Sequence, residues 1–313
     1  FEKIKKFIQS IIAKLNVFID RMRMTGQQLW AKYGKDKDLQ NTEKLKNLTF
    51  DGYKFGEASF NSAEFDNPQG APNLVKKAYG DDAVLPEKAM SKLMTAISDP
   101  NKKNPQQEGE SKEDAYDRRG TEALDAMIEK RGDLTSAERA SKMAVALTGK
   151  NSLGDDWAEA LRKELWGDKF TFTYGGDGFD VATVGKILSN PVNLDAIRDE
   201  YKKLEKAVGD YEKSLKNELD TYTKNLGSSE SAYDKTRLAK ATAYFNKYME
   251  AIKDAYAVIT GVKKIRSDYE QAKYKQARNM FSKMIGAAKA GGKKETDTND
   301  VEVDDDLIFD AEI

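Results

Sequence analysis

The chain of 313 residues has no cysteine and no histidine. Without cysteine there is no disulfide, no thiolate nucleophile and no cysteine-ligated metal. Without histidine the commonest general base is missing, and with it the Ser-His-Asp triad and the imidazole-bound zinc. Carboxylates could still carry chemistry, but no paired-carboxylate motif stands out among the 53 acidic residues. We therefore expect a protein that is not an enzyme and that holds no metal and no cofactor.

Long hydrophobic runs are also absent from the sequence. No stretch approaches the roughly 20 apolar residues that span a bilayer, and the most apolar segment, 7–19, is interrupted by polar residues. This segment does not predict a signal peptide, because it lacks a small-residue cleavage site and continues as an amphipathic pattern. The formal net charge is −1, so no global positive field attracts nucleic acid, although a local basic patch could contact DNA.

What the sequence does have is charge and helical periodicity. Charged residues make up 34% and apolar residues 39% of the chain, a balance typical of long helices that each bury only a stripe. Two heptad ladders, 193–222 and 235–262, predict a C-terminal antiparallel helical hairpin with a turn at 225–230. We expect its many tyrosines to pack in the seams, with their hydroxyls at the wet rim. The ladder residues are Leu194, Ile197, Tyr201, Leu204, Val208, Tyr211, Leu215 and Tyr222, followed by Leu238, Ala241, Phe245, Tyr248, Ile252, Ala255, Ile259 and Val262.

The apolar pattern of the second arm continues to Ile285, but Arg266 and Lys273 interrupt it. Because charged residues seldom lie in a dry seam, we expect this end of the helix to project from the bundle or to meet a wetter partner.

An acidic tail follows at 291–313 and carries the apolar cluster Leu307, Ile308 and Phe309. The tail is either a docking peptide for a basic or grooved partner or a disordered solubilising segment.

The first 34 residues predict an amphipathic helix that Gly26 interrupts and Gly34 ends. Its basic residues form either the solvated face of a packed helix or an attachment site for a membrane or for nucleic-acid phosphates. The chain begins at Phe1 without a methionine. We expect either an ordered region that starts late in a longer chain or the removal of a leader. The apolar residues, which we take as candidate partner contacts, are Phe1, Ile4, Ile8, Ile11, Leu15 and Phe18, and the basic ones are Lys3, Lys5, Lys6, Lys14, Arg21 and Arg23.

The region 35–190 predicts short helices and small β elements. Apolar residues at 48–55 alternate around Asp51-Gly52, which predicts a β-hairpin. Residues 169–174 alternate aromatic residues with threonine and predict an edge or hairpin strand before a glycine-rich turn. Residues 99–112 contain no apolar side chain other than proline and predict a mobile surface linker. Helices are expected at 73–79, 86–97, 113–130, 136–147 and 181–188, and Thr135 with Glu138 has the spacing of a capping box.

Together these patterns predict a mainly α fold, in which a helical bundle contains the long C-terminal antiparallel hairpin and one or two small β-hairpins. The expected organisation along the chain is an N-terminal amphipathic helix at 1–34, a mixed region at 35–190, the helical hairpin at 191–290 and the acidic tail at 291–313.

The sequence IKKFIQSIIAKL at 4–15 and WAKYG at 30–34 resemble the internal head (core) proteins of large tailed bacteriophages. In that family a basic amphipathic helix precedes a short β element of the kind expected at 48–60, and Lys- and Glu-rich helices follow. The similarity covers mainly residues 1–60. It implies a virion protein of the capsid interior, beneath the shell or near the portal. It also implies maturation by a prohead protease, which would account for Phe1.

We therefore expect a non-enzymatic virion structural protein, without a small-molecule substrate, that contacts capsid or portal-proximal proteins and copies of itself. The basic N-terminal helix could in addition contact DNA. Three alternatives remain open. One is a secreted or surface module that binds through the helical hairpin, and another is a membrane-active protein that uses the amphipathic segment 1–22. The third is an enzyme that uses carboxylates, which would require a concave pocket with two converging acids of perturbed pKa.

Overall fold

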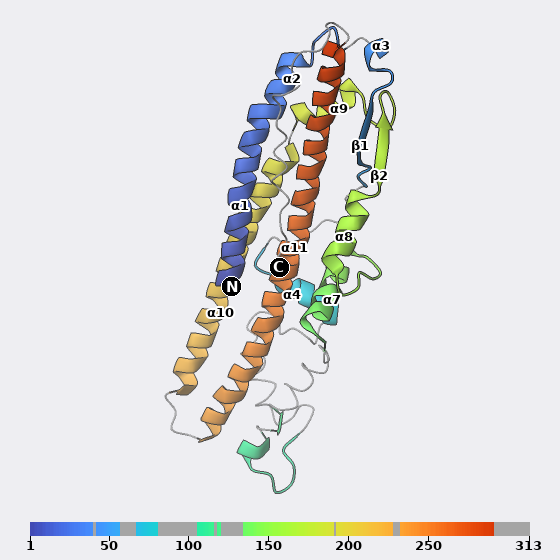
Figure 1. Cartoon of the computed structure of the whole chain (residues 1–313). Coiled ribbons are helices and arrows are strands. Elements are labelled where there is room, and N and C mark those ends of the chain that lie inside the picture. The colour runs from blue at the N-terminus through green and yellow to red at the C-terminus, as the bar shows by residue number, and fades with distance from the viewer. Residues whose placement is uncertain are drawn as a thin grey trace. The chain divides into compact units, whose positions relative to one another are not determined.

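A computed structural model of the chain is mainly α-helical, which confirms the predicted fold class (Figure 1). The contacts divide the chain into two compact units, each built from three separate segments. Unit 1 comprises Phe1–Met24, Tyr53–Lys169 and Pro191–Tyr274, and unit 2 comprises Thr25–Gly52, Phe170–Asn190 and Lys275–Ile313. The structure describes residues 1–39, 42–56, 67–80, 105–115, 118–119, 134–190, 192–227 and 232–290.

Several predicted segments lie outside the described residues. They are the helix expected at 86–97, most of the helix at 113–130, the linker residues 99–104, the turn residues 228–230 and the tail 291–313.

The predicted helical hairpin is confirmed in unit 1. Its arms are α10 (Val192–Gly227) and α11 (Ala232–Ala290), of which residues up to Tyr274 belong to this unit. The heptad ladder explains the packing, because residues at alternating three- and four-residue steps share one face of a helix. The ladder residues that are buried are Leu194, Ile197, Tyr201, Leu204, Val208, Tyr211 and Leu215 in α10, and Phe245, Tyr248, Ile252, Ala255, Ile259 and Val262 in α11.

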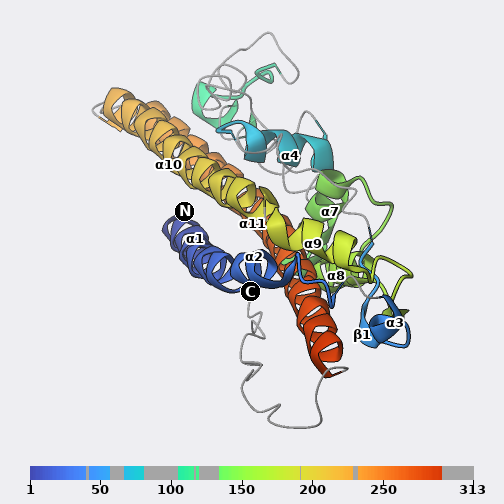
Figure 2. The same ribbon diagram turned by 90° about the horizontal axis from the view of Figure 1, so that it is seen from above.

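The N-terminal helix α1 (Glu2–Met22) lies along α10 in unit 1, and Figure 2 shows the two helices side by side from above. Near Gly26 the helix widens into a short π-helical turn, η1 (Arg23–Gln27), so the predicted interruption is confirmed. The chain then continues as α2 (Gln28–Tyr33), and Gly34 follows its last turn as expected. The buried face of α1 consists of Ile8, Ile11, Leu15, Phe18, Ile19 and Met22.

Unit 1 also contains the shorter helices α4 (Gly70–Tyr79), α7 (Ser136–Thr148) and α8 (Trp157–Trp166), and residues 112–115 and 118–119 are helical as well. The capping box predicted at the start of α7 is confirmed, since the Thr135 hydroxyl accepts from the Glu138 N–H and the Glu138 carboxylate accepts from the Thr135 N–H. At the start of α8 a single bond provides the cap, in which the Asp156 carboxylate accepts from the Glu159 N–H over 3.4 Å. These caps satisfy backbone donors that the first turn of each helix leaves open.

The hairpin predicted at 48–55 is wrong. The segment forms one continuous strand, β1 (Thr49–Tyr53), which pairs with the distant strand β2 (Lys169–Thr173) in a two-stranded antiparallel sheet. The Tyr174 N–H donates to the Leu48 carbonyl over 2.9 Å. Gly52 lies inside the strand and not in a turn, beside the amide end of the Gln276 side chain.

Unit 2 contains α2, α3 (Thr42–Leu45), α9 (Val181–Ser189) and the end of α11 from Lys275. Of the two alternatives predicted for this end of α11, projection from the bundle is wrong, since Phe281 and Met284 are fully buried, and a wetter partner stays a prediction. Trp30 of α2 covers Phe281, with the two ring centroids 5.3 Å apart. A second aromatic contact in the same unit joins Phe50 of β1 to Phe179 over 5.9 Å. The helix therefore ends inside an aromatic core.

Candidate functional site

The structure places the predicted N-terminal partner residues inside unit 1. Ile8, Ile11, Leu15 and Phe18 are buried, and Phe1 and Ile4 are half-buried. The ring of Phe1 lies 6.1 Å from that of Tyr256, edge to face. A partner could reach the four buried side chains only if α1 left the bundle. Leu307, Ile308 and Phe309, the other predicted contacts, lie outside the described residues.

Polar contacts at both ends hold α1 on α10. The Lys5 ammonium lies 3.0 Å from the Glu212 carboxylate near the start of α1, and Arg23 lies 2.7 Å from Asp195 just beyond its end. The two helices are therefore antiparallel. Hydrogen bonds from Lys216 and then from Lys5 hold the pKa of Glu212 below its ordinary value. The charged contacts and the apolar contacts both fit one register of α1 against α10. They therefore stabilise α1 as a packed helix of unit 1.

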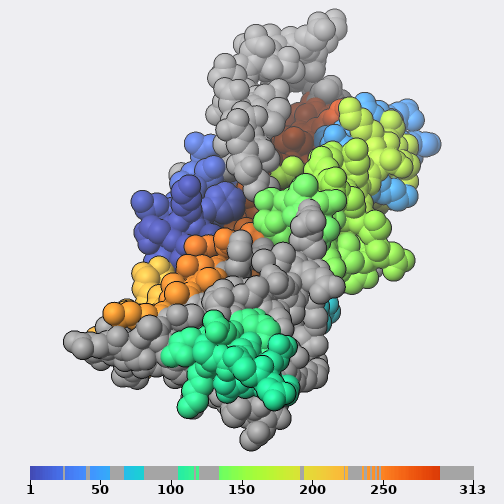
Figure 3. Space-filling view, turned by 90° about the horizontal axis from the view of Figure 1, so that it is seen from below, coloured from blue at the N-terminus to red at the C-terminus, as the bar shows by residue number. Residues whose placement is uncertain are grey.

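The side of α1 that faces away from α10 carries cations and two exposed apolar side chains. Phe7 is 37% exposed and Val17 is 56% exposed, which are high values for large hydrophobic residues in this chain. The exposed residues on this side of α1 include no acidic residue, although Glu2 and Asp20 lie at its edge. The space-filling view shows the blue residues of the N-terminal helix at the surface (Figure 3). We name this surface the outer face of α1 and define it as Lys3, Lys6, Phe7, Ser10, Lys14, Val17 and Arg21, all of them exposed.

Tyrosines form the interior of the hairpin, as predicted, but the hydroxyls of Tyr201, Tyr211, Tyr248 and Tyr256 are buried and not at a solvent-exposed edge. The Tyr211 and Tyr248 hydroxyls are 2.6 Å apart and hydrogen-bonded to one another. Burial raises the pKa of Tyr248 to about 12 and raises the pKa of Tyr211 and of Tyr256 as well. These phenols stay protonated at neutral pH. They consequently act as packing groups, and Tyr211 and Tyr248 also as hydrogen-bond partners of one another, with no role as bases.

A charged cluster joins α10 to α11 in unit 1. Lys263 is only 2% exposed, and its ammonium lies 3.1 Å from the Glu200 carboxylate, which Arg266 also contacts at 3.3 Å. The cluster compensates buried charge, because the carboxylate lies between two cations. It also explains how Arg266 fits into the helix without breaking the packing. Across the part of the chain that the structure describes, no group of three or more acidic side chains could hold a metal ion.

A half-exposed aromatic cluster in unit 1 was not foreseen from the sequence. We name it the aromatic patch and define it as Tyr53, Phe55, Trp166 and Tyr269. Phe55 contacts Trp166 and Tyr269 with ring centroids 6.3 Å and 5.5 Å apart. Tyr53, which is 38% exposed, lies 6.3 Å from Phe55. The members come from three distant segments, so no local pattern could reveal the patch, and only the aromatic richness of 50–55 hinted at it.

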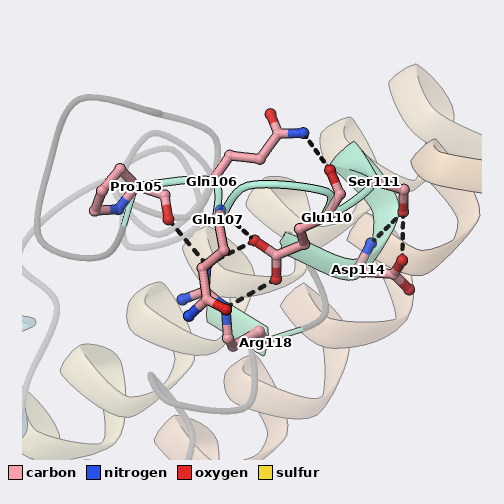
Figure 4. Close-up of polar contacts among 7 residues, drawn as sticks. All are labelled: Pro105, Gln106, Gln107, Glu110, Ser111, Asp114 and Arg118. Carbon is pink, nitrogen blue, oxygen red and sulfur yellow. Dashed lines mark hydrogen bonds and ion pairs between the residues drawn. The ribbon is translucent and has the colours of Figure 1, made fainter.

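Hydrogen bonds hold the segment from Pro105 to Arg118 together in unit 1 (Figure 4). The Arg118 guanidinium donates to both oxygens of Glu110 over 2.9 Å and to the Pro105 carbonyl over 3.0 Å. Ser111 and Asp114 add a local cap, in which the Asp114 N–H donates to the Ser111 hydroxyl over 3.0 Å. The bidentate pair keeps the pKa of Glu110 low, at about 2.

This low pKa predicts acid loosening of the Pro105–Arg118 segment. A carboxyl whose folded pKa is depressed contributes its full stabilisation above its ordinary pKa of 4.5 and loses it as the pH falls through about 2. We expect the Arg118 Nε–H to be protected from solvent exchange above pH 4.5 and to lose this protection as the pH falls from 4.5 to about 2. NMR follows the exchange. The Glu110→Gln variant is the control and should show weak protection at every pH. Equal protection in both proteins would contradict the assignment.

The comparisons with known proteins give no relative for this chain. No family model, no curated protein and no solved structure matches it. Among the helices that the structure describes, none is both long and apolar enough to span a membrane.

Proposed function

We propose that this chain is a non-enzymatic structural protein that acts through protein–protein contacts. From the resemblance of residues 1–60 we further propose that the contacts are made inside a bacteriophage head, with capsid or portal-proximal proteins and with other copies of the chain. The aromatic patch is the observation that carries the first part of this proposal.

The patch has the chemistry of a protein interface. Tryptophan and tyrosine are enriched at the centres of such interfaces, because a large rigid ring buries much area at a low cost in conformational entropy. Here Trp166 and Phe55 are half-buried and Tyr53 is exposed. The Tyr269 hydroxyl donates to the Gly56 carbonyl over 2.5 Å and holds the base of the patch in place. The rings are thus ordered before any partner arrives, which favours binding.

The helical frame of unit 1 supports a structural role. The helices α10 and α11 pack along a buried apolar interface, and α1 packs antiparallel to α10. These long helices form a framework joined by apolar and charged contacts. Such a framework presents surface residues at constant spacing, which assembly through surface complementarity requires. No chemistry on a small molecule is needed to explain these features.

The virion assignment is tested on purified native particles. We expect many copies of the chain per particle by quantitative mass spectrometry, and we expect them to resist added protease until the shell is opened. A chain that is missing from purified particles, or digested while the shell is intact, would contradict an internal head protein. Recovery of the chain bound to a host surface ligand would favour a secreted or surface binding module.

The interface is tested by photo-crosslinking at the aromatic patch. We replace Tyr53 with p-benzoylphenylalanine, which keeps an aromatic ring at the exposed position. We expect an ultraviolet-dependent crosslink to a second copy or to another particle protein during assembly. The matched control carries the same group at Lys203, an exposed residue of α10. Equal crosslinking at both positions, or none at Tyr53, would show that the patch is not an interface.

A further inference from the structure

We propose that the outer face of α1 docks on an anionic lipid bilayer. This inference is independent of the aromatic patch and goes beyond the proposed structural role. Four cations lie on the face together with Phe7 and Val17, and we identify the partner by the chemistry that both kinds of side chain require at once.

The cations form a local positive strip on a chain without net positive charge. Lys3, Lys6, Lys14 and Arg21 are exposed on one side of α1, and a helix of this length extends them over about 27 Å. The formal net charge of the whole chain is −1, so attraction to an anionic surface must come from a strip of this kind. Each lysine or arginine close to an anionic leaflet strengthens binding several-fold.

The two apolar side chains favour a bilayer over nucleic acid. Phosphates of a duplex would attract the cations equally well, but they offer nothing to an exposed phenyl ring or isopropyl group. In a bilayer Phe7 and Val17 enter the boundary between headgroups and acyl chains, while the neighbouring cations stay with the headgroups. The spacing suits this arrangement, since Lys3 lies one helical turn before Phe7 and Arg21 one turn after Val17.

The opposite side of α1 determines how the helix binds. Its apolar stripe, including Ile8 and Leu15, is buried, and the Lys5–Glu212 and Arg23–Asp195 pairs hold it there. Docking through the outer face therefore needs no release of α1 from the bundle. We expect peripheral binding without damage to the bilayer, in contrast to a membrane-active helix that inserts its main apolar stripe.

Vesicle flotation with the full chain tests the proposal. The vesicles are phosphatidylcholine alone or phosphatidylcholine with about one third phosphatidylglycerol, which makes the surface anionic. We expect the chain to float with the anionic vesicles and to stay behind with the neutral ones. Added salt should weaken the binding, because salt screens the attraction between the cations and the headgroups.

Two paired variants separate the contributions of charge and of apolar contact. Lys3→Glu with Lys6→Glu should lower the partition coefficient on anionic vesicles by about tenfold or more. Phe7→Ser with Val17→Ser should lower it by about threefold to tenfold. The matched control is Lys203→Glu with Lys206→Glu, which makes the same charge change on exposed residues of α10 and should bind almost as the parent does. Circular dichroism confirms that each variant is folded.

Four results would overturn the proposal. The first is no flotation of the parent chain with anionic vesicles. The second is equal loss of binding in the α10 control, which would indicate a nonspecific charge effect. The third is binding to a short DNA duplex that is lost in the lysine variant but unchanged in the Phe7 and Val17 variant, which would indicate a nucleic-acid surface. Release of a trapped dye would contradict peripheral docking, because α1 would then have left the bundle. None of these results depends on where the chain lies in a particle.

Discussion

Replacing Gly185 with alanine is expected to destabilise unit 2 by about 1–3 kcal/mol, since an inserted methyl group forces well-packed neighbours out of place. A Cβ at this position of α9 would lie 2.1 Å from Cη2 of Trp30 and 2.5 Å from Cζ2 and Cζ3. Neighbours restrict the movement of the ring: its centroid lies 5.3 Å from that of Phe281, and the Gly34 backbone is so close that a Cβ there would lie 2.8 Å from Cδ2 of Trp30. Urea denaturation measures the loss, and fluorine NMR of 5-fluorotryptophan should show a shifted Trp30 signal.

Gly286→Ala is the matched control for Gly185→Ala. Gly286 also lies within a helix and in unit 2, but no heavy atom would come within 4 Å of an added Cβ. Alanine restricts the unfolded chain and favours the helix, so this variant should gain about 0.5–1 kcal/mol. Opposite signs for the two substitutions would establish the close approach of Trp30. Similar losses in both would mean that glycine at Gly185 serves another purpose.

Replacing Ile8 with alanine is expected to lower the free energy of unfolding by about 2–5 kcal/mol, the range for large-to-small changes in a core. Ile8 is 0% exposed and packs in the interior between α1 and the hairpin. The change removes buried hydrocarbon and leaves a cavity that the long helices cannot easily close. Urea denaturation gives the magnitude, and limited proteolysis within α1 should become faster.

Its neighbour Phe7 provides the control. Phe7→Ala removes a larger side chain from the exposed side of the same helix turn, and we expect a change within about 0.5 kcal/mol. A large loss on Phe7→Ala with little effect on Ile8→Ala would mean that α1 packs with the opposite face. Such a result would also withdraw the outer face of α1 as a free surface.

Helical periodicity predicted the long elements well because the information is local. The steps from Leu194 to Leu215 give the direction of the seam along α10, and the capping box at Thr135 gives the start of α7. The same reasoning recognised the stripe of α1 but assigned it to an outside partner. An apolar stripe shows that a helix must pack against another element, whereas the identity of that element depends on the whole fold. In the structure α10 supplies much of it.

Long-range pairing could not be predicted in the same way. Asp51-Gly52 has the composition of a hairpin turn, yet both residues lie within β1, which pairs with the distant strand β2. Arg266 interrupted an apolar pattern, and its partner Glu200 lies on the other arm of the hairpin. Each error arose at a residue whose role depends on a neighbour that is far away in the sequence. The aromatic patch was missed for the same reason.

The pairing of β1 with β2 implies an order of events during synthesis. The whole stretch from Lys54 to Asp168 leaves the ribosome between the two strands, so β1 waits for its partner while the intervening helices emerge. Contacts of long sequence separation form late, because a large loop must close first. The arms α10 and α11 follow one another directly in the sequence and can pack against each other as soon as both are synthesised. Until β2 arrives, β1 is an open edge in the nascent chain, and this interval is when the protein is most exposed to aggregation.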